Sequence, residues 1–258
     1  MTSAHATHPG LVRQNNEDSL RTDDNQGIYL LADGIGGHNA GEIASALAVE
    51  TVYTALSSCI ANCSSDDLFD LMAHALRTAH AEIAAKARSS LSFMGMGTTL
   101  VVAVVRENMV YIAHTGDSRA YHYSQPHPLP NPPFMPQRVL EREGTLLRRI
   151  TNDHTMGDQL LANGVPREQI QEKQFHNLTQ AIGCGAPPLP DFSTVEFDRG
   201  DLLLLCSDGL TDMLADSEIE AILTNGDADL DTLAGNLVAA ANANGGRDNV
   251  SVVLVKSP

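Results

Sequence analysis

The sequence predicts an α+β fold in which layers of antiparallel strands pack against pairs of helices. Three strand-like stretches follow one another at 98–105, 109–116 and 119–123, and the connections between them are too short for helical crossovers. We therefore expect these strands to be antiparallel. Apolar residues at helical spacing predict helices at 40–58 and 66–89. The length of 258 residues favours one large domain or two small ones, and the 43% of hydrophobic residues suffice for a sizeable core.

The remaining segments continue this alternation of strands and helices. An apolar strand is predicted at 27–33. The region 124–147 begins with SQPHPLPNPPFMPQ, a stretch that holds six prolines. We interpret it as a surface loop within the domain, because strand and helix patterns resume beyond it. The later predicted elements are a helix at 157–171, a strand at 202–208, helices near 216–225 and 229–244, and a last strand at 249–255.

The chain is strongly acidic, with 32 aspartates and glutamates against 16 lysines and arginines. This balance disfavours nucleic-acid binding, because contacts to phosphate groups need a basic patch and the sequence has none. No apolar run approaches the roughly 18 residues of a membrane helix, and the first ten residues lack the basic and apolar regions of a secretory signal. We expect a cytoplasmic protein without membrane insertion. Its four cysteines form no CxxC pair, and we expect them to be reduced.

A glycine-rich loop follows the predicted strand at 27–33, within the stretch YLLADGIGGHNAGE (29–42). A dinucleotide-binding fingerprint would need a glycine or alanine where Asn39 stands. A phosphate-binding P-loop would need a lysine where Glu42 stands, and a carboxylate at that position would repel phosphate. The loop therefore fits neither kind of nucleotide site.

Carboxylates recur beside small or turn-forming residues elsewhere in the chain. Asp33 and Asp208 each follow an apolar run and precede a glycine, so we expect each of them to end a strand at a rigid position. Aspartates that converge in this way repel one another unless cations lie between them. Oxygen ligands select Mg²⁺ or Mn²⁺ over zinc. The other candidate ligands are Glu17, Asp18, Asp117 and Asp248.

A set of short motifs occurs in an order that resembles the metal-dependent protein phosphatases of type 2C, the PPM family. The resemblance is strongest to the compact bacterial members, which remove phosphate from serine and threonine, and it extends from residue 13 to residue 255. The motifs are R-x-x-N-E-D (13–18), D-G-x-G-G-H-x-A-G-E (33–42), G-T-T (97–99), G-D-S-R (116–119), T-x-D-H (151–154), S-D-G-L-T-D (207–212) and G-x-x-D-N (245–249).

The resemblance implies a four-layer αββα sandwich, in which a central antiparallel β-sandwich is flanked by helix pairs, formed by a single domain over residues 1–258. It implies that phosphoserine and phosphothreonine are hydrolysed by in-line attack of a water that bridges two cations, Mn²⁺ or Mg²⁺, with a third cation nearby. The substrates would be phosphoproteins, the targets of a serine/threonine kinase, and we expect the enzyme to be a monomer. The region 157–177 corresponds to the flap that lies beside the active site in this family.

The resemblance also assigns roles to single residues. Arg13 would grip the substrate phosphate, a task that suits a planar guanidinium. Asp33 would bridge the two cations, and the carbonyl of Gly34 would bind one of them. The remaining assignments are Asp208 and Asp248 as further ligands of the first cation, Glu17 and Asp18 as outer ligands that act through water, and Asp117 with Asp208 as ligands of the third cation.

Some of these assignments leave alternatives open. His38 would protonate the leaving alkoxide, since an imidazole titrates near neutral pH, or it would form a hydrogen bond that stabilises the loop. Animal relatives carry the acid histidine directly after the Asp-Gly pair, where this chain has Ile35. Asp117 is either a cation ligand or only a turn former. We expect His154 to anchor a loop near the cleft. The alternative functions are a catalytically weak regulatory relative and a phosphatase dedicated to partner switching.

Overall fold

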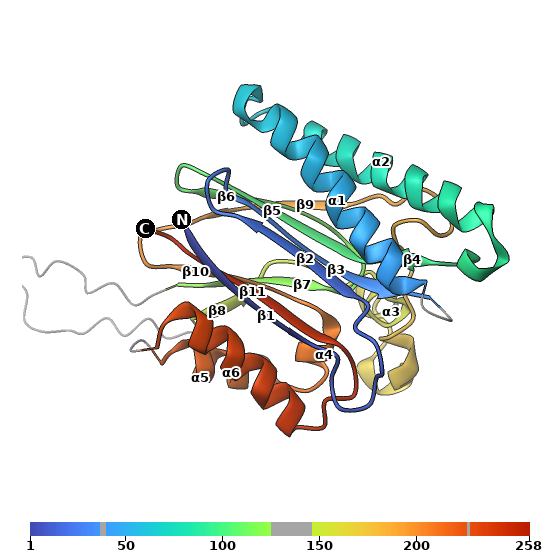
Figure 1. The fold of residues 1–258 in the computed structure, drawn as a ribbon. Helices are drawn as coiled ribbons and strands as arrows, with labels where there is room; N and C mark the ends of the chain where they lie inside the picture. The colour runs from blue at the N-terminus through green and yellow to red at the C-terminus, as the bar shows by residue number, and fades with distance from the viewer. Residues whose placement is uncertain (37–39, 125–145, 226–227) are drawn as a thin grey trace, which may run out of the picture.

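Two antiparallel sheets lie face to face, and helices cover the outer face of each sheet (Figure 1). The computed structural model describes residues 1–36, 40–124, 146–225 and 228–258, so almost all of the predicted loop at 124–147 lies outside the described residues. The four layers confirm the predicted α+β sandwich.

Each sheet is continuous and brings together strands from distant parts of the chain. The first sheet has the order β1 (Thr2–His8), β11 (Val250–Lys256), β10 (Leu202–Cys206), β7 (Arg119–Tyr123), β8 (Leu147–Arg149). The second has the order β2 (Asp18–Asp23), β3 (Ile28–Ile35), β5 (Leu100–Arg106), β6 (Met109–Thr115), β9 (Asp191–Glu196), and the short β4 (Gly97–Thr98) also pairs with β3.

Helix pairs flank the two sheets on opposite sides (Figure 1). The helices α1 (Gly41–Cys59) and α2 (Leu68–Ser89) cover the second sheet, and α5 (Asp216–Leu223) and α6 (Leu230–Ala243) cover the first. Two shorter helices are α3 (Met156–Ala162) and α4 (Asp208–Thr211). Single-turn 3₁₀ helices occur at Ile60–Asn62, Leu91–Phe93, Arg167–Gln169 and Glu172–Gln174.

Burial on both faces explains why the central strands are apolar throughout. In β10, Leu203 and Leu205 face the interior between the two sheets, whereas Leu204 and Cys206 pack against α5 and α6. All four side chains are buried. A strand covered on both faces therefore appears in the sequence as a continuous apolar run rather than as an alternating pattern.

The helix α1 shows how a core helix can resemble a membrane segment. The expectation that no apolar run approaches the length of a membrane helix is wrong for Gly41–Asn62, which is long and apolar enough to cross a membrane by length and composition alone. Ala44, Ala48, Val52 and Leu56 recur every fourth residue on one side of this helix, and all four are fully buried against the second sheet and α2. The fold thus accounts for the apolar character of α1.

Two predictions about the elements need correction. The strand at 119–123 does not pair with its predecessor: β5 and β6 form the expected antiparallel pair, but the chain then crosses to the first sheet, where β7 pairs with β10. The helix predicted at 157–171 ends at Ala162, because Gly164 takes a left-handed conformation with φ +82° and Pro166 follows.

Candidate metal and phosphate site

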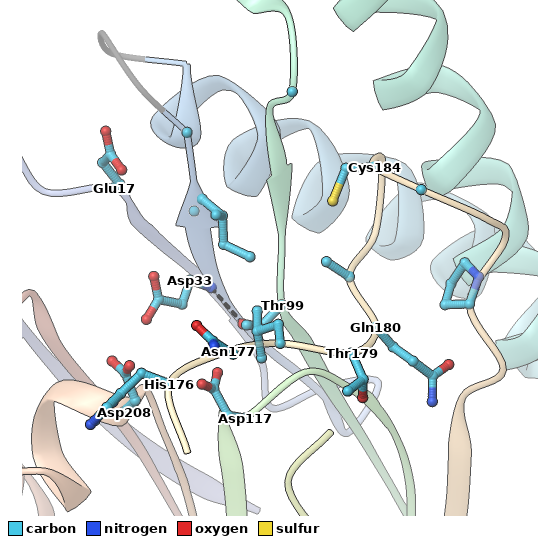
Figure 2. A pocket seen from close by; sticks show the side chains of 18 of the residues that line it. Glu17, Asp33, Thr99, Asp117, His176, Asn177, Thr179, Gln180, Cys184 and Asp208 are labelled. Carbon is cyan, nitrogen blue, oxygen red and sulfur yellow. Dashed lines mark hydrogen bonds between the residues drawn. The ribbon is translucent and has the colours of Figure 1, made fainter. Parts of the chain in front are cut away.

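Carboxylates from separate segments meet around a cleft of about 1270 Å³. Asp18 opens β2 and is paired with Asp33 of β3 across the antiparallel ladder. Asp117 lies in the connection between β6 and β7, Asp208 opens α4, and Asp248 shortly precedes β11. Figure 2 shows Asp33, Asp117 and Asp208 gathered at one end of the cleft. The fold therefore brings together the aspartates that the sequence indicated.

The two aspartates expected at strand ends occupy different positions in the elements. Asp33 lies inside β3, because that strand continues to Ile35 by pairing with β4. Its backbone N–H donates to Oγ1 of Thr99 at 2.9 Å (Figure 2), and its carbonyl accepts from the N–H of Thr99. Asp208 lies beyond the end of β10, at the start of α4. Both residues are nevertheless held by regular backbone structure.

Close packing explains the glycines around Asp33. A Cβ at Gly34 would lie 2.3 Å from the carbonyl oxygen of Gly41, and a Cβ at Gly41 would lie 2.4 Å from Oε2 of Glu17. The N–H of Gly34 donates to the carbonyl of Glu17 at 3.1 Å. The glycines therefore allow β3, the start of α1 and the segment before β2 to approach one another closely.

Burial and mutual repulsion make these carboxyl groups difficult to ionise. Burial, followed by the charges of Asp18 and Asp208, raises the pKa of Asp33 well above its ordinary value of 3.8. Burial and the charge of Asp117 raise the pKa of Asp208 in the same way. The pKa of Asp18 rises to about 6, chiefly through burial, and that of Asp117 to about 7 through burial and the charge of Asp153. Such a cluster favours any bound positive charge.

The oxygen atoms of the cluster fit a hard divalent cation. Oδ1 of Asp18 and Oδ1 of Asp208 are buried and have no hydrogen-bond donor within the described part of the chain. Buried carboxylate oxygens without a donor are rare unless another group binds them. A set of ligands made only of oxygen suits Mg²⁺ or Mn²⁺.

Arg13 is the only lysine or arginine among the described residues that line the cleft. Its Nη2 donates to Oδ2 of Asp248 at 2.7 Å, and its side chain is about half exposed, at 56%. An ion pair this exposed contributes little to stability. The guanidinium has further donors that can bind phosphate oxygens at the mouth of the cleft.

Asn249 holds the segment of Glu17 in place, a role that the sequence did not indicate. Its Oδ1 accepts from the N–H of Glu17 at 2.8 Å, and its Nδ2 donates to the carbonyls of Pro9 and Asn15. Burial raises the pKa of Glu17 as well. The amide of Asn249 thereby links the segment before β2 to the start of β11. The signal was present in the sequence, as the last letter of the G-x-x-D-N motif.

His176 and Asp212 were also missed in the sequence. Nδ1 of His176 lies 3.5 Å from Oδ2 of Asp212, and both residues line the cleft. Each of them offers a potential ligand atom within 4.8 Å of one on Asp208. Asp212 belongs to the S-D-G-L-T-D motif, whereas His176 lies in the flap region, where no motif indicated it.

The histidines predicted from sequence have different outcomes. His154 forms two hydrogen bonds with the backbone of Gly116. The backbone N–H of His154 donates to the Gly116 carbonyl at 3.0 Å, and the imidazole Nδ1 of His154 accepts from the Gly116 N–H at 3.3 Å. It therefore anchors the turn that carries Asp117, as predicted. His38 lies outside the described residues, so both of its proposed roles stay predictions.

Comparison with known proteins agrees with this geometry. The family described as Protein phosphatase 2C matches residues 8–235. The chain is 34% identical over 261 residues to the serine/threonine phosphatase stp of Listeria monocytogenes, and the match covers 99% of this chain and 96% of that protein.

Solved structures show the same fold at similar identity. The serine/threonine phosphatase PstP/Ppp of Mycobacterium tuberculosis matches with a TM-score of 0.81 and 32% identity, covering 99% of this chain and 98% of that chain. The catalytic domain of PstP in complex with two manganese ions matches with a TM-score of 0.78 and 32% identity, covering 99% and 97%. Together with the carboxylate cluster, these matches place the chain in the protein phosphatase 2C family, as a metal-dependent serine/threonine protein phosphatase.

Proposed function

We propose that this enzyme removes phosphate from phosphoserine and phosphothreonine at the cleft between Arg13 and the aspartate cluster. The observation that carries the proposal is the position of Asp33 and Asp208, each only partly exposed, beside other carboxyl groups, with raised pKa values and a buried oxygen of Asp208 that no described donor satisfies. Two divalent cations, Mn²⁺ or Mg²⁺, would activate a water for in-line attack and neutralise charge that develops on the phosphate oxygens.

Each candidate site residue would then have a defined role. Asp33, Asp208 and Asp248 would hold the cations, with the carbonyl of Gly34. Glu17 and Asp18 would act as outer ligands through water. Arg13 would orient the phosphate, for which its exposed guanidinium is well placed at the mouth of the cleft. His38 would donate a proton to the departing alkoxide or stabilise the loop that carries it.

A third cation between Asp117 and Asp208 is part of the proposal. Asp117 is buried, and its charge is among the causes that raise the pKa of Asp208, which supports a shared site. If Asp117 is a ligand, Asp117→Ala should lower kcat sharply at saturating Mn²⁺ and leave the melting temperature nearly unchanged. If it is only a turn former, kcat should stay near normal while the free energy of unfolding drops by about 1 kcal/mol.

The substrates in the cell are proposed to be phosphoproteins that a serine/threonine kinase modifies. The named relatives are serine/threonine phosphatases, which supports this class of substrate. We further propose a single domain over residues 1–258 that acts as a cytoplasmic monomer. The alternatives are a catalytically weak regulatory relative and a phosphatase dedicated to one partner.

Metal content and turnover measured on one preparation test the proposal. We expect hydrolysis of p-nitrophenyl phosphate and of a phosphoserine peptide with Mn²⁺ or Mg²⁺, and loss of both activities in EDTA. Asp33→Ala should lose bound metal together with turnover. Retained turnover after rigorous metal removal would contradict the mechanism, and metal binding without any turnover would favour the regulatory relative. A panel of phosphopeptides separates a broad phosphatase from one dedicated to a single partner.

A further inference from the structure

The cleft has two chemically different ends. Acidic side chains and Arg13 line one end, whereas the segment 177–189, with the sequence NLTQAIGCGAPPL, lines the other and carries no charged residue. Figure 2 shows this segment passing from Asn177, beside the aspartates, through Thr179 and Gln180 to Cys184. In a protein with a net charge of −16, an uncharged side of the cleft suits a different kind of substrate group from the phosphate.

Several contacts fix the backbone of this segment. Ile182 and Thr98 exchange two backbone hydrogen bonds, at 2.9 and 2.8 Å. The N–H of Gly183 donates to Nδ1 of His80 at 3.0 Å, and the N–H of Leu189 donates to Oε1 of Gln180 at 2.7 Å. The segment is thus anchored to β4, to α2 and to itself.

Local sequence stiffens the same segment further. The adjacent Pro187 and Pro188 have restricted φ angles, and Pro188 is buried. A rigid backbone loses little conformational entropy when a substrate binds. The segment is therefore suited to be a preformed contact surface.

The anchored segment presents apolar side chains to the cleft. Leu189 is 79% exposed and lines the cleft, and Ala186 and Pro187 beside it are exposed as well. The half-buried Cys184 completes this surface, which we call the apolar shelf (Cys184, Ala186, Pro187, Leu189). A single exposed leucine is common on protein surfaces, but here it lies on a rigid segment that lines the same cleft as Arg13.

We propose that the apolar shelf binds an apolar side chain near the phosphoserine of the substrate and so makes the enzyme select for such sequences. This inference rests on the proposed function. An extended peptide advances about 3.3 to 3.6 Å per residue, so a peptide whose phosphate lies at Arg13 can place a neighbouring side chain farther along the cleft. The shelf has no carboxylate or cation that would favour a charged side chain instead.

Two phosphoserine peptides of equal length and charge test the proposal. One carries leucines on both sides of the phosphoserine, and the other carries serines at the same positions. We expect the kcat/KM of the wild-type enzyme to be about five-fold higher for the leucine peptide than for the serine peptide. This ratio corresponds to the free energy gained when a leucine side chain is partly buried. Leu189→Ser should bring this ratio close to one, while turnover of p-nitrophenyl phosphate, which carries no neighbouring peptide side chain, stays unchanged.

A matched control uses Leu91→Ser, which alters a leucine that is 84% exposed and does not line the cleft. This variant should keep the wild-type preference. A wild-type enzyme without a preference, or a preference that survives in Leu189→Ser, would overturn the inference while leaving the phosphatase function intact. Failure of the wild type to hydrolyse p-nitrophenyl phosphate and both peptides would instead overturn the proposed function, and the inference with it.

Discussion

At the scale of single residues, the clustered carboxyl groups of the candidate site repel one another when they are ionised. Asp33 and Asp208 are only partly exposed and lie within a cluster of like charges. Among the described residues that line the cleft, Arg13 carries the one guanidinium, and it is already paired with Asp248. Removing one charge from such a cluster should relieve its neighbours, whereas removing a charge from the surface should not. This difference makes the site testable at the level of one residue.

The metal-free protein should lose stability as pH rises from about 4 to about 7. The pKa values of Asp18 and Asp117 are raised from 3.8 to about 6 and about 7 in the folded protein, so the folded state binds protons more tightly than the unfolded chain within this interval. The free energy of unfolding therefore decreases with increasing pH there. Melting temperatures measured in EDTA at several pH values check this, and saturating Mn²⁺ should restore stability at neutral pH.

A pair of isosteric variants separates the cluster from the general acidity of the chain. Asp208→Asn removes a charge from the cluster, so its melting temperature in EDTA should depend less on pH than that of the wild type. Asp231→Asn removes the same charge from the exposed surface of α6 and should keep the wild-type dependence. Equal pH dependence in both variants would assign the effect to net charge instead.

Arg13→Ala should separate substrate binding from metal binding. We expect KM for a phosphopeptide to rise about ten-fold or more with a smaller change in kcat, because the contact to the phosphate exists already in the ground state. Bound metal and melting temperature should stay nearly unchanged, since the ion pair with Asp248 is exposed. Arg88→Ala, at an exposed site in the last turn of α2, serves as control. Unchanged kinetics in Arg13→Ala would move phosphate recognition to another residue.

At the scale of elements, the strength of the apolar pattern decided what could be predicted. The helix expected at 40–58 is α1, and the apolar runs gave β3, β5 and β10 to within a few residues. The strand β1 was missed because it is half exposed at a sheet edge, and the only apolar residues of TSAHATH are the two small alanines Ala4 and Ala6, which give a weak alternation. Its position depends on pairing with β11, at the other end of the chain.

In the candidate site too, short motifs predicted which residues matter, whereas their positions depend on contacts between segments far apart in the sequence. The motif order indicated which aspartates to examine: Asp33, Asp117, Asp208 and Asp248 line the cleft, and Asp18 is paired with Asp33 beside it. The place of Asp33 inside β3 depends on the pairing with β4, some sixty residues later, which no local pattern reveals. The contribution of His176 depends on how the backbone of residues 157–177 runs beside the cleft. The sequence of that region predicted only a helix, and this helix ends at Ala162.

Close approach of elements at the glycine-rich stretch should make Gly41 sensitive to substitution. In Gly41→Ala the added Cβ would overlap Oε2 and the carboxyl carbon of Glu17, and also the backbone of Gly34. We expect a loss of about 1 to 3 kcal/mol in the free energy of unfolding and weaker Mn²⁺ binding. Gly235→Ala is the matched control, because a Cβ in that part of α6 meets nothing within 4 Å and should stabilise the helix by up to about 1 kcal/mol. Denaturant unfolding and metal titration measure both effects, and a Gly41→Ala protein as stable as wild type would contradict the packing argument.

At the scale of the whole molecule, the candidate site lies where the two sheets meet. Asp18 and Asp33 belong to the second sheet, whereas Asp208 and Asp248 are attached to strands of the first. Asp117 lies in the connection that crosses from one sheet to the other. Cations bound between these residues would link the two halves of the sandwich, so metal binding should be coupled to global stability.

The net charge of −16 should govern how salt affects the reaction of the whole molecule with its substrates. Two divalent cations would leave the protein strongly negative, so an acidic phosphopeptide should be repelled at long range. Because the screening length falls from about 30 Å at 0.01 M salt to about 10 Å at 0.1 M, kcat/KM for an acidic phosphopeptide should rise over this range at saturating Mn²⁺. For a phosphopeptide with arginines at positions that do not adjoin the phosphoserine, kcat/KM should fall over the same range, since screening then weakens the attraction between peptide and enzyme. Stopped assays in KCl measure both trends. If kcat/KM for the acidic peptide decreased with increasing KCl, the local positive field of Arg13 and the bound cations would outweigh the net charge of the protein during encounter.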